Sequence, residues 1–372
     1  MAGIYIHIPF CKQACNYCDF HFSTTYQTYR GQLVESLVLE LERKKNYLQS
    51  AEINTIYFGG GTPSLLSKTE LQKILKFIYK CYPVSQNIEI TLEANPDDLT
   101  LDYLKELKRA GINRLSIGVQ SFDDTQLSWM NRAHNGAQAK EAVLLAKKTG
   151  FDVSIDLIYG TPNLTLDKWK ETLQKFIEFE INHLSAYCLT IEINTPLYHQ
   201  LKKGKTKSVS TKSQITQYET MLEILEKHHF EQYEISNFAQ KNKIAIHNTN
   251  YWNGVPYLGI GPSAHSYDGK SRAWNIKNNL KYINAINQQE AFIETEILTK
   301  KDQFNEMILT RLRTKWGVDL QELNEIMKIP ESFHKELRIH QKSNLIYQNE
   351  NTIFLTKQGG LLADRISSEL FI

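Results

Sequence analysis

Short apolar runs alternate with longer amphipathic stretches over the first 190 or so residues of the chain. The apolar runs are rich in β-branched and aromatic residues, which favours strands, and lie at residues 4–8, 53–58, 88–92, 114–119, 152–158 and 183–189. Between them, apolar residues recur at helical spacing over residues 29–47, 68–82, 101–110, 137–149 and 166–180. This alternation predicts six βα units around a parallel sheet.

Six βα units are too few to close an eight-stranded barrel. We therefore expect an α/β fold built as an open, three-quarter (β/α)6 barrel, TIM-like, with its loops gathered at the C-terminal ends of the strands. The glycines at 59–61 follow the second predicted strand and Gly160 follows the fifth, as tight loops at that end require. We expect the chemistry of the protein on this face.

The pattern changes after residue 200, and the chain is predicted to have three regions. Residues 1–200 form the partial barrel, residues 201–298 form an extension that covers its site, and residues 299–372 form a small C-terminal domain. The extension holds a Lys-rich turn at 202–207 and a helix near 211–228. The last region shows three helical patterns, two short strand candidates and a closing helix, which favours a winged-helix-like domain.

Charge and composition disfavour nucleic acid and membranes as partners and favour metal binding by the cysteines. The formal net charge of +2 gives no electrostatic case for binding nucleic acid or an anionic membrane. The sequence has no signal-peptide pattern and no run of roughly 20 apolar residues, so we expect a cytoplasmic protein without a transmembrane segment. Three of the five cysteines lie close together near the start, which suits metal ligation better than a disulfide framework.

The strongest chemical signal is the spacing Cys11-x3-Cys15-x2-Cys18 on the loop after the first strand. Three thiolates can hold three irons of a [4Fe–4S] cluster and leave the fourth iron open for the amino and carboxylate groups of S-adenosylmethionine. The alternatives are a zinc site completed by His21, or buried thiols without a metal. Zinc sites usually add a distant second pair of cysteines, which this chain lacks, so the cluster is the favoured interpretation.

The sequence from Tyr5 to Cys18, followed by Gly-Gly-Gly-Thr-Pro at 59–63, resembles the radical S-adenosylmethionine superfamily. Within it, the chain is most similar to the oxygen-independent coproporphyrinogen III oxidase-like branch. The likeness covers nearly the whole chain and includes Glu-Ala-Asn-Pro at 93–96, Gly-Val-Gln-Ser at 118–121 and Ile-Asp-Leu-Ile-Tyr-Gly-Thr-Pro at 155–162. The resemblance implies the fold predicted above.

One departure separates the chain from the true oxidases of this branch, which look like C-x3-C-x2-C-x-C. Phe20 stands where their fourth cysteine falls, and with His-Asn-Thr-Asn-Tyr-Trp at 247–252 this pattern resembles the haem-chaperone members. The resemblance implies a protein that binds haem, a [4Fe–4S] cluster and S-adenosylmethionine, and transfers haem to an acceptor protein of unknown identity. The alternatives are an oxidase that decarboxylates a tetrapyrrole through a 5′-deoxyadenosyl radical, or a radical methyltransferase.

Polar residues at the strand ends are candidates for the cofactor pocket. Glu93 ends the third strand and Gln120 the fourth, where Glu93 can accept hydrogen bonds from a ribose hydroxyl or an ammonium group, or simply be solvated. Asp156 lies in an apolar strand and needs a partner. Arg132 is a candidate for that partner, or for a clamp on a carboxylate of the cofactor or of a porphyrin.

The resemblance implies a larger set of cofactor-binding positions, some of which serve a second S-adenosylmethionine in the oxidase. The set is Tyr5, Gly60, Gly61, Thr62, Glu93, Gln120, Arg132 and Asp156, and Tyr17 is a further cofactor-binding candidate. Taken alone, a glycine run also fits an ordinary turn, although glycine does let a backbone approach a ligand closely. No catalytic residue is assigned.

Haem needs an axial ligand and aromatic or cationic neighbours. The candidates are His247, Tyr251, Trp252 and His265, although a histidine among aromatic residues is more often a hydrogen-bonded packing residue. Cys81 and Cys188 are read as small buried thiols and are assigned no role.

Overall fold

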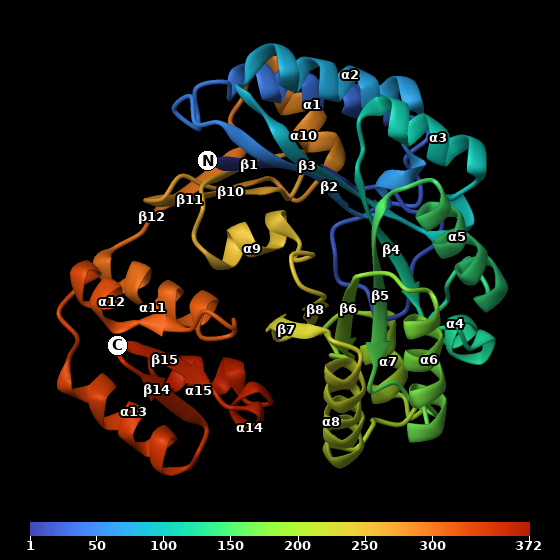
Figure 1. Cartoon of the computed structure of the whole chain (residues 1–372). Helices are drawn as coiled ribbons and strands as arrows, with labels where there is room; N and C mark the ends of the chain where they lie inside the picture. Colours follow the sequence, from blue (N-terminus) through green and yellow to red (C-terminus); the bar gives the residue numbers. More distant parts are fainter.

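The six apolar runs form six parallel strands of one curved sheet. In the computed structural model, which describes residues 1–372, these strands follow one another in chain order across the sheet. Figure 1 shows that the sheet bends into an open arc and does not close, so the expected partial barrel is confirmed. The strands are β1 (Ala2–Ile8), β2 (Ile53–Gly60), β3 (Val84–Ala94), β4 (Arg114–Gln120), β5 (Asp152–Tyr159) and β6 (His183–Cys188).

Helices cover the convex side of the arc (Figure 1). They pack against the outward residues of the strands, such as Ile4, Ile6 and Ile8, which are fully buried. The helices of the barrel are α1 (Arg30–Arg43), α2 (Lys68–Cys81), α3 (Leu101–Ala110), α4 (Asp124–Trp129), α5 (Gly136–Lys148) and α6 (Leu166–Glu178). Single 3-10 turns, η1 (Pro63–Leu65) and η2 (Pro96–Asp98), follow β2 and β3.

Helix α2 shows how local sequence sets these boundaries. Ser67 caps its start, accepting from the backbone of Glu70, while the Glu70 carboxylate accepts from the Ser67 N–H at 2.7 Å. Such a cap stabilises a helix by about 1 kcal/mol. The four side chains that it buries recur at spacings of three and four, which turns one stripe toward the sheet: Leu71, Ile74, Leu75 and Ile78.

The extension lengthens the sheet at both edges, where the sequence predicted only a cover over the site. Strands β7 and β8 continue antiparallel beyond β6, whereas β9 pairs in parallel with β1 and is followed by β10, β11 and β12. Helix α9 lies inside the arc (Figure 1). The elements are α7 (Pro196–Lys202), α8 (Thr211–Lys227), β7 (Glu231–Glu234), β8 (Asn237–Ala239), α9 (Ile246–Trp252), β9 (Tyr257–Ile260), β10 (His265–Tyr267), β11 (Ser271–Asn275), α10 (Asn279–Gln288) and β12 (Ile293–Ile297).

The last region has a sheet and a hydrophobic core of its own. Phe304, Ile308 and Phe333 are among the buried residues of this second core, and β13 adds a third strand to the two predicted. The order of its helices and strands is that of the winged-helix-like domain we expected. The elements are α11 (Lys300–Arg311), β13 (Val318–Asp319), α12 (Leu320–Ile326), α13 (Glu331–Lys342), β14 (Ile346–Asn349), β15 (Thr352–Leu355), α14 (Lys357–Gly360) and α15 (Ala363–Glu369).

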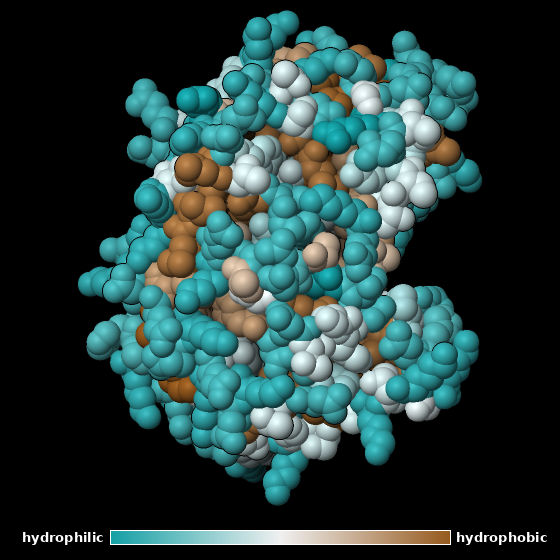
Figure 2. All heavy atoms as spheres, turned by 90° about the vertical axis from the view of Figure 1, so that its right-hand side faces the viewer, coloured by the Kyte–Doolittle hydropathy of each residue, from teal (hydrophilic) through white to brown (hydrophobic).

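Charged contacts join this domain to the barrel. The guanidinium of Arg272 on β11 pairs with both carboxylate oxygens of Glu306 on α11, and Arg313 lies over the ring of Trp252 at 4.5 Å. The helix-covered side of the molecule presents mainly hydrophilic side chains, with apolar ones showing between them (Figure 2). None of the helices combines the length and the apolar character needed to cross a bilayer.

Candidate functional site

The loop after β1 carries Cys11, Cys15 and Cys18 and is fixed to the loop after α4. The N–H of Asn16 donates to the carbonyl of Met130 at 3.1 Å, and the Asn131 amide donates to the carbonyl of Ala14 at 2.7 Å. All three cysteines are free thiols and partly exposed. The sequence placed them on one loop, and the structure shows that a second loop holds it in position.

Two of the three thiols accept hydrogen bonds from side chains outside their own loop, one after β2 and one after α4. Thr62 donates to the sulfur of Cys11 at 3.4 Å, and Arg132 donates to the sulfur of Cys15 at 3.3 Å. Burial raises the pKa of Cys11 to about 11 and that of Cys18 to about 12. A bound metal reverses this preference, because a coordinating thiol is held as the thiolate.

The donor set fits a cluster better than a single metal ion. No three His, Cys, Asp or Glu side chains converge on one point in the structure, as a single zinc ion requires. The fourth ligand in the zinc alternative, His21, instead has its Nε2 2.7 Å from the side-chain oxygen of Asn279. In a cubane cluster each thiolate binds a different iron, so three separated thiols on one loop suit it.

The glycine run at the end of β2 lets this strand approach the cluster loop. Gly60 has φ +109°, and a Cβ there would lie 2.6 Å from the ring of His7. A Cβ on Gly61 would lie 2.6 Å from the carbonyl oxygen of Phe10. A side chain at Gly60 would therefore collide with His7 on β1, whereas one at Gly61 would push Phe10 and the cluster loop away, so that Thr62 would no longer reach Cys11.

Glu93 lies at the end of β3 and is held by two donors. The Tyr57 hydroxyl donates to one carboxylate oxygen at 2.7 Å, and the N–H of Gly60 donates to the other at 3.1 Å. Burial is the main cause that raises the pKa of Glu93 to about 7, and the nearby Asp156 adds to it. The carboxylate is thus in place for a cationic or hydroxyl group bound inside the arc.

Arg132 and Asp156 do not form the ion pair that was one of the expected roles. Asp156 accepts from the Ser116 hydroxyl at 3.1 Å, and burial raises its pKa to about 6. Arg132 donates to Asn95 at 2.6 Å and to the carbonyl of Gly118 at 2.7 Å. Its Nε is buried without a partner, which leaves a donor for an anionic group of a ligand beside Cys15.

The remaining cofactor candidates lie around the same space. Gln120 ends β4 with φ +63°, after a bulge, and a Cβ on Gly118 would be 3.1 Å from its amide nitrogen. Tyr17 is partly buried. Burial raises the pKa of its hydroxyl, and the nearby charge of Arg132 acts in the opposite direction. Tyr5 has its hydroxyl 3.1 Å from Nδ1 of His7.

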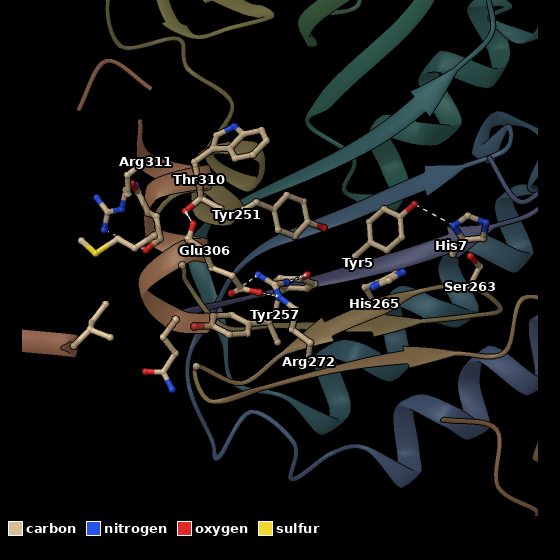
Figure 3. A pocket seen from close by; sticks show the side chains of 18 of the residues that line it. Tyr5, His7, Tyr251, Tyr257, Ser263, His265, Arg272, Glu306, Thr310 and Arg311 are labelled. Carbon is tan, nitrogen blue, oxygen red and sulfur yellow. Dashed lines mark hydrogen bonds and ion pairs between the residues drawn. The ribbon is translucent and has the colours of Figure 1, made fainter. Parts of the chain in front are cut away.

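A cavity of about 1120 Å³ lies between this site and the C-terminal domain. Residues 19–21, directly after Cys18, line one side of the cavity, and α11 and α12 line the opposite side. In Figure 3, Tyr5, Tyr251 and His265 lie around the same space, whereas Thr310 and Arg311 approach from α11. The volume exceeds that of ordinary small-molecule pockets, and the wall combines aromatic rings with cations.

The four haem candidates occupy different environments. His247 is buried, with Nδ1 2.8 Å from the Thr55 hydroxyl and Nε2 2.9 Å from the Tyr251 hydroxyl, so neither nitrogen is free for a metal. Tyr251 and Trp252 both line the cavity, and His247 holds the ring of Tyr251 in place.

His265 is the candidate whose ring faces the cavity without a hydrogen-bond partner. It is exposed, and its ring centroid lies 6.2 Å from that of Trp274. The protein atoms that cover part of its ring, and the charge of Arg272, lower its pKa, which favours the neutral form that binds metals.

Sequence reasoning missed several residues that shape the site. Asn95 joins Thr62 to Arg132, and Gly118 makes room for the side chains of Arg132 and Gln120. Both lie within segments that carried the family resemblance, which was the only available signal. Nothing in the sequence indicated that Arg272 and Glu306, 34 residues apart, would meet in the cavity wall.

Comparisons with known proteins agree with this geometry. The family model for the radical SAM superfamily matches residues 5–176, and the one for the HemN C-terminal domain matches residues 298–362. The Heme chaperone HemW of Bacillus subtilis is 33% identical over 371 residues, covering 98% of both chains. The Heme chaperone HemW of Lactococcus lactis is 33% identical over 376 residues, covering 99% of this chain and 97% of the relative.

A solved structure has the same fold as this chain. The coproporphyrinogen III oxidase HemN from Escherichia coli, described as a radical SAM enzyme, matches with a TM-score of 0.85 at 24% sequence identity. The match covers 100% of this chain and 90% of that chain. Membership of the superfamily implies a [4Fe–4S] cluster and S-adenosylmethionine. With full-length relatives at 33% identity, the chain belongs to the HemW family within the radical SAM superfamily.

Proposed function

We propose that this protein is a haem chaperone that binds haem in the large cavity and transfers it to an acceptor protein. The observation that carries the proposal is the cavity itself, which joins the cluster loop to the C-terminal domain and contains an unpartnered histidine. The names of the full-length relatives support the same function.

His265 is the proposed iron ligand. Its ring nitrogens are free and face the cavity, whereas those of His247 are held by Thr55 and Tyr251. His247 then acts as a positioning residue that keeps the ring of Tyr251 in the wall. Arg311 and Lys277 line the same cavity without ion-pair partners and are suited to haem propionates.

The cofactor candidates meet the cavity at Tyr5, which belongs to both sets of residues. Cys11, Cys15 and Cys18 would hold the [4Fe–4S] cluster, and the remaining cofactor candidates would hold S-adenosylmethionine near it. When bound, the cluster supplies one-electron reduction of that cofactor. Within this pocket, Glu93 is placed to accept from a cationic group, and the orphaned Nε of Arg132 to donate to an anionic one.

Phe20 gives the haem carrier preference over a decarboxylating oxidase. Phe20 is 67% exposed and lines the cavity two residues after Cys18, so an apolar ring stands where the oxidases place a fourth cysteine. An exposed aromatic ring at a cavity wall suits contact with a flat apolar ligand.

The test is a titration of the cluster-loaded protein with haem, followed at the Soret band. We expect a stoichiometric Soret shift in the wild type and at least tenfold weaker binding in His265→Ala. The exposed His228 provides a matched control, and His228→Ala should behave as the wild type. Loss of the signal in His247→Ala but not in His265→Ala would contradict the ligand assignment.

Transfer is measured by mixing the haem-loaded protein with apomyoglobin as a general acceptor. The Soret band should move to that of myoglobin, and no 5′-deoxyadenosine-dependent change in the porphyrin should accompany the transfer. Conversion of coproporphyrinogen III to protoporphyrinogen by the reduced protein would instead make it an oxidase despite Phe20.

A further inference from the structure

The connection between α7 and α8 carries an unusual concentration of positive charge. Between Glu192 and Glu219 there is no acidic residue, but there are five lysines, which we call the lysine segment: Lys202, Lys203, Lys205, Lys207 and Lys212. All five are exposed, and none forms an ion pair. The stretch between these two glutamates therefore carries five positive charges and no negative one, in a chain whose overall net charge is only +2.

A direct contact joins this region to the cluster loop. The N–H of Leu197, in the first turn of α7, donates to the carbonyl of Asn16 at 2.8 Å, and Asn16 lies between Cys15 and Cys18. Helix α7 is about 10 Å long and leads from that contact into the lysine segment. The cavity, by contrast, is lined by residues 19–21, which follow Cys18, and by no residue of α7.

Exposed apolar side chains stand at the opposite end of α7. Ile191 is 42% exposed and Ile193 is 69% exposed, and they lie four and two positions before the residue that caps the helix, Thr195. Apolar contacts bordered by unpaired charges of one sign are typical of surfaces where a partner of opposite charge docks transiently. The surface thus has both components of a protein interface; α7 links it to the cluster loop, and none of its residues lines the cavity.

We propose that the lysine segment, with Ile191 and Ile193, is the docking surface for a small acidic electron-carrier protein that reduces the cluster. The proposal rests on the cluster of the proposed function, because cleaving S-adenosylmethionine consumes one electron that must come from outside the chain. With a flavodoxin as donor, the anionic flavin hydroquinone loses one electron to the oxidised cluster and becomes the neutral semiquinone. No proton moves in this step.

The surface is tested with the charge-reversal variant K202E/K203E/K205E/K207E. Its matched control is K140E/K148E/K170E/K175E, which reverses four exposed lysines without ion pairs on α5 and α6. Binding of fluorescently labelled, oxidised flavodoxin to the cluster-free chain is measured at low salt. We expect at least tenfold weaker binding in the first variant and less than a twofold change in the control, with the difference shrinking as salt is added.

Reduction of the cluster-loaded chain gives the second measurement. Flavodoxin hydroquinone should reduce the reversal variant at least tenfold more slowly than the wild type, whereas dithionite should reduce both at the same rate. Equal flavodoxin binding in the wild type and the reversal variant would overturn the proposal. So would binding of the wild type to phosphatidylglycerol vesicles but not to flavodoxin, which would make the segment a membrane site.

Haem titration of the same variants separates this proposal from the proposed function. An unchanged Soret titration in the reversal variant, together with lost flavodoxin binding, supports a docking surface distinct from the haem cavity. A wild type that binds flavodoxin through these lysines but never binds haem would reject the chaperone and leave the docking surface standing.

Discussion

The two faces of β1 differ although they belong to one short strand. Ile4, Ile6 and Ile8 point to the helical layer and are fully buried, whereas Tyr5 and His7 point into the arc and line the cavity. Neighbouring strands repeat the contrast, with Ile56 and Phe58 outward and Tyr57 inward. The outward face supplies the free energy of folding, while the inward face holds polar groups ready for ligands. Substitutions on the two faces should therefore fail in different ways.

The largest effect on ligand binding is expected from removing one of the three thiols on the loop that follows β1. Cys15→Ala leaves two thiolates, so the iron content and the visible charge-transfer absorption should be lost almost completely. The far-UV circular dichroism should stay that of the wild type, because Cys15 is partly exposed and is not part of the core. Full iron content in this variant would contradict the ligand assignment.

Removing a core side chain from the other face should have the opposite pattern. Ile6→Ala creates a cavity between β1 and the helices and should lower the free energy of unfolding by about 3 kcal/mol, measured by urea denaturation. Haem and iron bound per folded molecule should remain unchanged. If Ile6→Ala lost ligand binding without losing stability, the assignment of stability to the outward face and of ligand binding to the inward face would be wrong.

A smaller, pH-dependent effect is expected at Glu93. Its pKa of about 7 in the folded protein lies above the value of about 4.3 for an unfolded chain, so the folded state binds more protons between these values. The stability of the cluster-free protein should therefore fall as pH rises from about 4.5 to about 7. Glu93→Gln should remove part of this loss, on the order of 2 kcal/mol. Urea denaturation at several pH values checks this, and identical pH profiles would refute it.

The outward face could be predicted from the sequence, and the inward one only in part. Apolar periodicity located all six barrel strands because each buries a row of side chains against helices. β9 was missed because it has only four residues and pairs with β1 across some 250 positions of the chain. The cysteine spacing was visible because all three thiols share one loop.

The hydrogen-bond partners inside the arc could not be predicted from the sequence, because they depend on which strands lie next to each other. Asp156 was expected to need a partner, and it has one, but in Ser116 rather than Arg132. His247 drew attention by its aromatic neighbours, yet those neighbours and Thr55 occupy both its nitrogens. Residue type identified the candidates, and only geometry decided which nitrogen is free.

The position of β9 also has a consequence for how the chain is made. β1 leaves the ribosome before the other strands of its sheet, but the partner on one of its edges, β9, is about 250 residues away. At ordinary rates of synthesis, that interval lasts on the order of 10 to 50 seconds. During this interval, one edge of β1 has unpaired backbone N–H and C=O groups. The cysteine loop then follows a strand that is paired on one edge only. Nascent chains should therefore depend on protection from aggregation until residue 260 has emerged.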